Sequence, residues 1–133
     1  MLRVILLLLN FAVSTPVLAQ QPKDFLGIFA TEASKADGGF TGFDAMRGKS
    51  FFNTRHGDWA CASCHTDNPA ATGKHAVTDK PIQPLAPIAN PERFTSAKKV
   101  DKWFRRNCND VLKRACTARE KGDVLTYLLS NDF

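Results

Sequence analysis

The stretch "DWACASCHTDN", residues 58–68, decides how the rest of the chain is interpreted. It places Cys61 and Cys64 three positions apart, with His65 directly after the second cysteine. C-x-x-C-H is the attachment signature of c-type haem. Thiols at this spacing can reach the vinyl groups on one edge of a porphyrin, and the next imidazole can bind the iron. We therefore expect thioether bonds at Cys61 and Cys64, an axial iron bond at His65, and one covalent haem c.

Two other uses of this motif compete with haem. A redox-active C-x-x-C would belong to a βαβ thioredoxin-like pattern, which this sequence lacks. A zinc site would need two further ligands. The side chains available for it are Cys108, Cys116, His56 and His75. The trailing histidine, together with the evidence for export and for an all-helical chain, favours haem.

The chain opens with the pattern of a secretory signal peptide. Residues 1–19, "MLRVILLLLNFAVSTPVLA", combine a positive Arg3, an apolar run and a small-residue cleavage pattern at the end. The apolar run is too short to span a bilayer as a helix, and an uncleaved anchor is the alternative. We expect cleavage after Ala19. Residues 20–133 would then form one exported, periplasmic domain without a membrane span.

The charge of the chain is moderately positive. The 133 residues carry 18 Lys and Arg against 13 Asp and Glu, a formal net charge of +5. This excess suits contact with an acidic protein and is too small to indicate nucleic-acid binding. Many of the cations gather in one segment, which is either a solvated face or a docking surface for a redox partner. They are Lys98, Lys99, Lys102, Arg105, Arg106, Lys113 and Arg114.

Helical periodicity runs through most of the mature chain, and no segment alternates as a strand would. We expect helices over residues 22–36, 44–54 and 96–106, the third with Thr95 as its N-cap. A final helix should begin at the capping box "TARE", residues 117–120. The sequence therefore predicts an all-α fold. Its tryptophans, Trp59 and Trp103, are expected to pack against the core or the haem.

A long segment between these helices lacks any regular pattern. Residues 66–95 contain five prolines, which oppose helix interiors and central strands. An irregular loop of this length is unusual in a compact domain. We expect it to wrap a cofactor in the core.

Two cysteines remain once the motif has used its own. Cys108 and Cys116 are separated by the short polar stretch "NDVLKRA". Cysteines of exported proteins usually pair, so we expect a disulfide between them. Whether it only joins two helices or also supports a functional residue stays open at this point.

The usual sixth ligand of a small cytochrome c is missing. Such proteins complete the iron with a methionine downstream of the motif, but this chain has only Met1 and Met46. Met1 belongs to the leader, and Met46 precedes the motif. The candidates that remain are His75, His56, a lysine, an asparagine, or no ligand at all.

A specific resemblance narrows this choice. Residues 81–129, "PIQPLAPIANPERFTSAKKVDKWFRRNCNDVLKRACTAREKGDVLTYLL", resemble the C-terminal half of the sphaeroides haem protein (SHP) family of monohaem cytochromes c. The likeness includes C-x-x-C-H and is weak before Gly48. It implies a class I cytochrome c-like fold, with helices around one covalent haem and a Pro-rich loop. In such a fold Gly48 would let the N-terminal and C-terminal helices cross closely.

The resemblance also implies a ligand set. It makes Asn107 the sixth ligand, directly before Cys108, with Cys116 as the disulfide partner. Asn90 and Asn109 lie nearby, but neither directly precedes the cysteine. Judged without the resemblance, Asn107 would be interpreted as a helix C-terminal residue, where asparagine is favoured.

The expected function follows from the chemistry of an amide ligand. A neutral amide is a weak, hard donor that should bind ferric iron better than ferrous iron, so the sixth position should open on reduction. The resemblance implies electron transfer coupled to reversible binding of a small diatomic ligand such as O2 or NO. It also implies a multihaem cytochrome c and a membrane cytochrome b as electron partners. Such a protein is a carrier rather than an enzyme.

Two rival functions stay open. The first is a bis-histidine electron carrier that uses His75 as the sixth ligand. The second is a small haem enzyme that reduces an oxygen or nitrogen species, although no acid–base group in the sequence indicates one.

Overall fold

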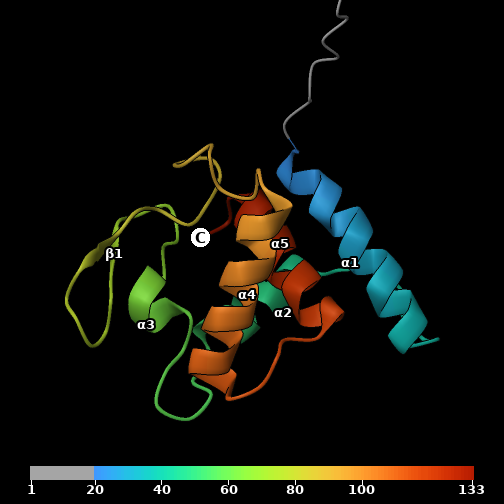
Figure 1. The fold of residues 1–133 in the computed structure, drawn as a ribbon, viewed down its shortest axis with the longest axis horizontal. Coiled ribbons are helices and arrows are strands. Elements are labelled where there is room, and N and C mark those ends of the chain that lie inside the picture. Colours follow the sequence, from blue (N-terminus) through green and yellow to red (C-terminus); the bar gives the residue numbers. More distant parts are fainter. Residues whose placement is uncertain (1–19) are drawn as a thin grey trace, which may run out of the picture.

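A computed structural model describes residues 20–133 (Figure 1). The expected leader, residues 1–19, lies outside the described residues. The helices are α1 (Pro22–Ala36), α2 (Ala45–Asn53), α3 (Ala62–His65), α4 (Ala97–Leu112) and α5 (Ala118–Ser130), and the strands are β1 (Gly73–Lys74) and β2 (Pro81–Ile82). The expected all-α class is confirmed. Among residues 20–133, no helix has the length and apolarity needed to cross a bilayer.

Helix α1 begins and ends where the sequence predicts. Pro22 occupies its first turn, where a missing N–H costs nothing. The Asp24 carboxylate accepts the backbone N–H of Gln21 at 2.7 Å. Phe25 and Phe29 lie on the buried face of the helix. They form one core cluster with Val100 of α4 and Leu125 of α5.

Helices α2 and α5 cross in close contact at Gly48. A Cβ added at Gly48 would lie 2.0 Å from the carbonyl oxygen of Asp123 and 3.0 Å from Cβ of Tyr127. The rings of Phe52 and Tyr127 meet edge-on, with their centroids 5.6 Å apart. The expected close crossing at Gly48 is confirmed, because only a residue without a side chain fits between these backbones.

An ion pair with a buried carboxylate and a half-exposed arginine, which the sequence did not predict, fixes the start of α2 on α5. Asp123 is only 5% exposed. Its carboxylate accepts Nε and Nη2 of Arg47, each at 2.9 Å, and the backbone N–H of Asp44 at 2.8 Å. The pairing raises the pKa of the Arg47 guanidinium. A buried carboxylate with three donors is fully compensated, so the pair sets the register of the crossing.

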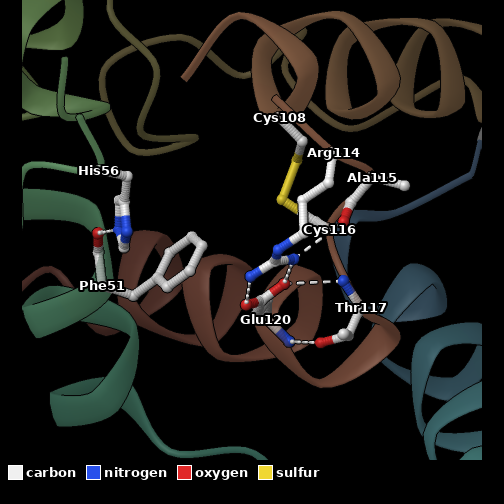
Figure 2. The surroundings of a disulfide bond; sticks show 8 residues. All are labelled: Phe51, His56, Cys108, Arg114, Ala115, Cys116, Thr117 and Glu120. Carbon is white, nitrogen blue, oxygen red and sulfur yellow. Dashed lines mark hydrogen bonds and ion pairs between the residues drawn. A yellow bond between two sulfur atoms is a disulfide. The ribbon is translucent and has the colours of Figure 1, made fainter. Parts of the chain in front are cut away.

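Helix α5 starts at the predicted capping box. The Thr117 hydroxyl accepts the Glu120 amide at 3.1 Å, and the Glu120 carboxylate accepts the Thr117 amide at 2.8 Å (Figure 2). Arg114 also binds the Glu120 carboxylate through both terminal nitrogens, at 2.7 and 2.8 Å. These contacts lower the pKa of Glu120, with the Arg114 hydrogen bond as the largest cause.

Helix α4 differs from its predicted bounds at both ends. It begins after Ser96 instead of Thr95, whose hydroxyl donates to the carbonyl of Glu92 at 2.9 Å. It continues to Leu112, six residues beyond the predicted end at residue 106. The added turns contain Asn and Asp, which are weak helix formers. They also contain Cys108, which is buried and bonded to Cys116, and the ion pair of Arg106 with Asp110 at 3.8 Å.

The apolar face of α4 was predicted only in part. Val100 is buried, and the Phe104 ring lies 5.6 Å from that of Phe29 and 6.4 Å from that of Phe94. Trp103 is 42% exposed and lies outside the protein core, so its expected packing against the haem stays a prediction. It lies between two cations, with Lys102 Nζ at 5.4 Å and Arg106 Cζ at 5.6 Å from its ring centroid. Both distances are within the range of a cation–π contact.

The long segment 66–95 contains one regular feature, a small hairpin. β1 and β2 pair antiparallel, with Gly73 opposite Ile82 and Lys74 opposite Pro81. The expectation of a wholly irregular loop is therefore wrong here. A two-stranded ribbon has only edge strands, which tolerate proline.

A disulfide joins α4 to the start of α5. The sulfur atoms of Cys108 and Cys116 lie 1.96 Å apart, and their Cα atoms 5.5 Å apart (Figure 2). Cys108 lies inside α4, and Cys116 directly precedes Thr117, the N-cap of α5. The bond therefore holds the second half of α4 against a helix that is itself fixed on α2.

Replacing Gly48 with Ala should destabilise the holoprotein, because the added methyl group would overlap the α5 backbone. We expect a loss of about 1–3 kcal/mol in the free energy of unfolding, measured in guanidinium chloride. The control is Gly27→Ala on α1, where nothing lies within 4 Å of the added Cβ. It should be neutral or stabilising by up to about 1 kcal/mol. Equal stability of the two variants would contradict the close crossing.

Removing the disulfide with Cys108→Ser and Cys116→Ser should reduce the free energy of unfolding by about 2–3 kcal/mol, the loop-closure value for a short loop. Peptide mapping of unreduced protein should recover the peptides of residues 108 and 116 joined together. Free thiols at both positions in freshly isolated protein would show that the bond does not form.

Candidate haem site

One helical turn brings the three residues of the motif together. Cys61 precedes α3, and its carbonyl accepts the amides of Cys64 at 3.2 Å and His65 at 3.0 Å. Residues three and four apart lie on the same face of a helix. Cys61 and Cys64 are not joined in a disulfide. The turn therefore presents two thiols and an imidazole from one short, rigid element.

The motif is anchored to the crossing of α2 and α5. Cys61 packs against the core cluster that contains Phe52 and Tyr127. The His65 ring lies 6.4 Å from the Phe52 ring, between centroids. The helix crossing thus fixes the position and direction of the motif.

The loop encloses the motif from the other side. A Cβ at Gly73 in β1 would lie 2.1 Å from the carbonyl oxygen of Cys64 and 3.1 Å from Cα of His65. The amide of Ala76 lies 3.4 Å from Cys64 Sγ. β1 therefore packs directly on the motif backbone, as expected of a segment that wraps a cofactor site.

Burial sets the protonation of the donors. It raises the pKa of the Cys61 thiol to about 11. It lowers the pKa of His65 to about 4, with the nearby charge of Arg93 as a second cause. At neutral pH the imidazole is therefore uncharged and keeps a lone pair for iron. A neutral imidazole beside two thiols is the donor set that covalent haem requires.

The zinc alternative is not supported by the placement of the side chains. Within residues 20–133 the structure gathers no cluster of three or more His, Cys, Asp or Glu that could hold a metal. Cys108 and Cys116, two of the four candidate zinc ligands, are bonded to each other. The chemistry of Cys61 and Cys64 is therefore left to a cofactor that binds thiols covalently.

Asn107 comes from a different element than the motif. It is half-buried in α4, directly before Cys108, and the helix continues to Leu112. The interpretation of Asn107 as a helix C-terminal residue is therefore wrong. In Figure 1, α4 stands between α1 and the part of the chain that carries α3 and β1.

The other candidate ligands lie in different surroundings. The Met46 side chain is 73% exposed. His75 Nδ1 accepts the amides of Val77 and Thr78, each at 3.2 Å, and so closes the turn of the hairpin. His56 Nε2 lies 3.1 Å from the carbonyl oxygen of Phe51, whose ring turns toward the disulfide side in Figure 2.

Arg93 is a residue near the motif that the sequence analysis missed. Its Nε donates to the carbonyl of Pro84 at 2.9 Å, and Nη2 donates to that of Gln83 at 2.7 Å. Its charge is close enough to contribute to the lowered pKa of His65. Nothing in the sequence distinguished it, because an arginine in a loop is usually a surface residue.

Comparison with known proteins gives relatives of one kind. The family model "Domain of unknown function (DUF1924)" matches residues 38–128. Cytochrome c'' of Methylophilus methylotrophus is 48% identical over 88 residues, which cover 62% of this chain and 61% of cytochrome c''. The match therefore spans less than two thirds of the length of cytochrome c''. Cytochrome c-type protein SHP of Cereibacter sphaeroides is 43% identical over 90 residues, covering 64% of this chain and 69% of SHP.

Solved structures of the same two proteins share the fold. Oxidized cytochrome c'' superposes with a TM-score of 0.75 at 38% identity, covering 82% of this chain and 93% of that one. Oxidized SHP, described as an oxygen binding cytochrome c, has a TM-score of 0.74 at 34% identity. The match covers 84% of this chain and 98% of SHP. A solution structure of cytochrome c'', described in terms of haem-ligand detachment, has a TM-score of 0.73 at 38% identity. The match covers 82% of this chain and 92% of cytochrome c''.

These likenesses confirm the cytochrome c-like fold around a haem. The motif on α3, the loop that packs on it and the donor set fit that cofactor. We conclude that the chain belongs to the DUF1924 family and is an SHP-family c-type cytochrome, a haem-iron protein in which Cys61 and Cys64 are positioned for covalent attachment.

Proposed function

We propose that this protein is an exported monohaem cytochrome c that couples electron transfer to reversible binding of a small diatomic ligand. The sixth ligand in this proposal is Asn107, which leaves the iron on reduction. One observation carries it: a half-buried asparagine lies inside α4, beside the disulfide, in a chain whose downstream part has no methionine.

On the proximal side we assign thioether bonds to Cys61 and Cys64 and the axial iron bond to His65. The neutral state of the buried imidazole supports that bond, because a protonated ring has no lone pair. When bound, haem iron would supply the redox change and an axial position that either the protein ligand or a small molecule could occupy. The rigid turn of α3 keeps the His65 side constant while the opposite side changes.

On the distal side, α4 is held at two places. Val100 and Phe104 fix its first half in the core with α1. The bond from Cys108 to Cys116 fixes its second half to α5. The backbone at Asn107 is therefore restrained from both directions. A ligand held in this way can leave and return by side-chain rotation alone, without moving the helix.

The amide explains why this ligand should be labile. An uncharged oxygen or nitrogen donor is harder and weaker than imidazole or thioether, and ferrous iron is softer than ferric iron. The bond should therefore form in the ferric state and break in the ferrous state. Electron arrival would then open the position for a diatomic molecule.

The bis-histidine alternative has to release His75 from its turn. Its Nδ1 already accepts two amide N–H groups, so the proton of the neutral ring resides on Nε2. Neither nitrogen then offers an unused lone pair. Iron binding would cost both hydrogen bonds and reorganise the hairpin, which favours Asn107.

The relatives support ligand release and ligand binding at this kind of haem. SHP is described as oxygen binding, and cytochrome c'' as a protein whose haem ligand detaches. The matches span 61–69% of those two proteins. That this chain shares their ligand release and oxygen binding is part of the proposal.

Electron partners would dock on the basic surface of α4. Its cations include Lys98 and Lys99, which have no carboxylate partner within residues 20–133. Such a surface suits an acidic redox protein. We propose a periplasmic location after removal of residues 1–19, with a multihaem cytochrome c and a membrane cytochrome b as electron partners.

The haem should be covalent. The isolated holoprotein should be heavier than its apo chain by one haem, and the colour should stay with the protein after acid–acetone extraction. Cys61→Ser combined with Cys64→Ser should lose both properties, whereas Cys108→Ser combined with Cys116→Ser should keep them. Colour that passes into the solvent, or zinc in place of iron, would contradict the assignment.

Asn107→Ala should change the ferric state and spare the ferrous state. Wild-type ferric protein should be low-spin or mixed, without a methionine–iron charge-transfer band, and ferrous protein should be high-spin and bind CO. In Asn107→Ala the ferric form should become high-spin or water-ligated, because the amide is gone. Optical and EPR spectra in both oxidation states, with and without CO, measure this.

Two variants serve as controls for this experiment. Asn109→Ala changes an exposed asparagine on the same helix, and His75→Ala removes the rival ligand. Both should leave the spectra unchanged. A low-spin ferrous spectrum that persists in Asn107→Ala and disappears in His75→Ala would establish the bis-histidine alternative instead.

A further inference from the structure

The arginines of residues 20–133 differ in how their charges are compensated. Most form an ion pair with a carboxylate within 4.0 Å, namely Arg47, Arg105, Arg106, Arg114 and Arg119. Arg55 and Arg93 have no such pair among the described residues. Arg55 is exposed and solvated, but Arg93 is half-buried. Arg93 is therefore the arginine whose charge lacks both full solvation and a counter-ion.

The contacts of Arg93 orient its charge without neutralising it. Nε and Nη2 donate to the carbonyls of Pro84 and Gln83 at 2.9 and 2.7 Å. Asn90 Nδ2 also approaches the Pro84 carbonyl, at 3.4 Å. Carbonyl groups carry no net charge, and burial lowers the pKa of the guanidinium. Nη1 takes part in neither of these bonds and can donate to a further partner.

The backbone after Arg93 keeps the side chain in this place. Phe94 has a φ of 57°, in the left-handed region that a bulky residue rarely adopts. The turn sends the Phe94 ring into the core, 6.4 Å from Phe104, while Arg93 points back to the loop carbonyls. A left-handed backbone is unfavourable for phenylalanine and persists only where the surrounding structure imposes it.

Arg93 lies on the side of the haem motif. Phe94, the residue directly after it, packs on the same core cluster as Cys61, and so does Leu85, which follows the Pro84 carbonyl that Arg93 binds. The cofactor of this family carries propionate carboxylates on its edge. A guanidinium fork is the side chain best suited to bind a carboxylate.

We propose that Arg93 is the counter-cation of a haem propionate and thereby positions the haem and raises its reduction potential. The carboxylate would complete the compensation that the two carbonyls leave unfinished. A fixed positive charge beside the haem stabilises the reduced state, which carries one negative charge more than the oxidised state. The inference depends on the haem and is independent of whether Asn107 is the sixth ligand.

The test measures the reduction potential of wild-type holoprotein and three variants. Arg93→Gln removes the charge and keeps an amide, Arg93→Lys keeps the charge without the fork, and Arg105→Gln removes an exposed charge on α4 as the matched control. Potentials are measured at low and high salt. Resonance Raman spectra of the same samples report the bending band of the propionate groups.

Arg93→Gln should shift the equilibrium several-fold toward the oxidised state and move the propionate band. The shift should persist in salt, because the site is partly buried. Arg105→Gln should have a smaller effect that salt removes. The proposal would be overturned if Arg93→Gln shifted the reduction potential no more than Arg105→Gln, or if the propionate band did not move. Arg93 would then serve only to hold the loop through its hydrogen bonds to Gln83 and Pro84.

Arg93→Lys keeps the proposal testable if Arg93→Gln yields no holoprotein. A lysine should hold the potential near that of the wild type, since the charge is retained, and should still move the propionate band, since the fork is lost. An unmoved band in this variant would overturn the proposal by itself.

Discussion

The close crossing of α2 and α5 at Gly48 is the constraint on which the rest of the molecule depends. A single missing side chain lets the two backbones touch, and the ion pair of Arg47 with Asp123 fixes their register. That contact places Phe52 against Tyr127 and so builds the surface on which Cys61 and His65 lie. The packing of α2 on α5 therefore positions the haem motif.

The two sides of the haem differ in how firmly they are held. The His65 side is one turn of helix, packed on a core and covered by β1. The side we assign to Asn107 belongs to α4, which is restrained through α1 at one end and through Cys108 at the other. A rigid backbone with a weak ligand allows one bond to break while the fold stays the same. Coupling between the electron and the ligand would follow from this asymmetry.

The features that were predicted correctly from the sequence are those that depend on short stretches of the chain. The Thr117–Glu120 capping box, the bounds of α1 and the small residue at the crossing each depend on nearby residues or on one steric requirement. The end of α4 was predicted too early, because only the folded chain shows that the bond from Cys108 to Cys116 holds the last turns against α5. Arg93 was missed, because only the folded loop shows that its charge has no carboxylate partner among the residues that the structure describes. Asn107 entered through resemblance, since an asparagine alone carries no signal for iron.

Crystal structures of the holoprotein in its ferric and ferrous states test the central claim most directly. The ferric structure should show the Asn107 amide bound to iron opposite His65, with α4 and the disulfide in place. The ferrous structure should show the same helix, with the amide rotated away and the sixth position open. An imidazole from His75 on the iron, or an Asn107 bond retained in both states, would contradict the account.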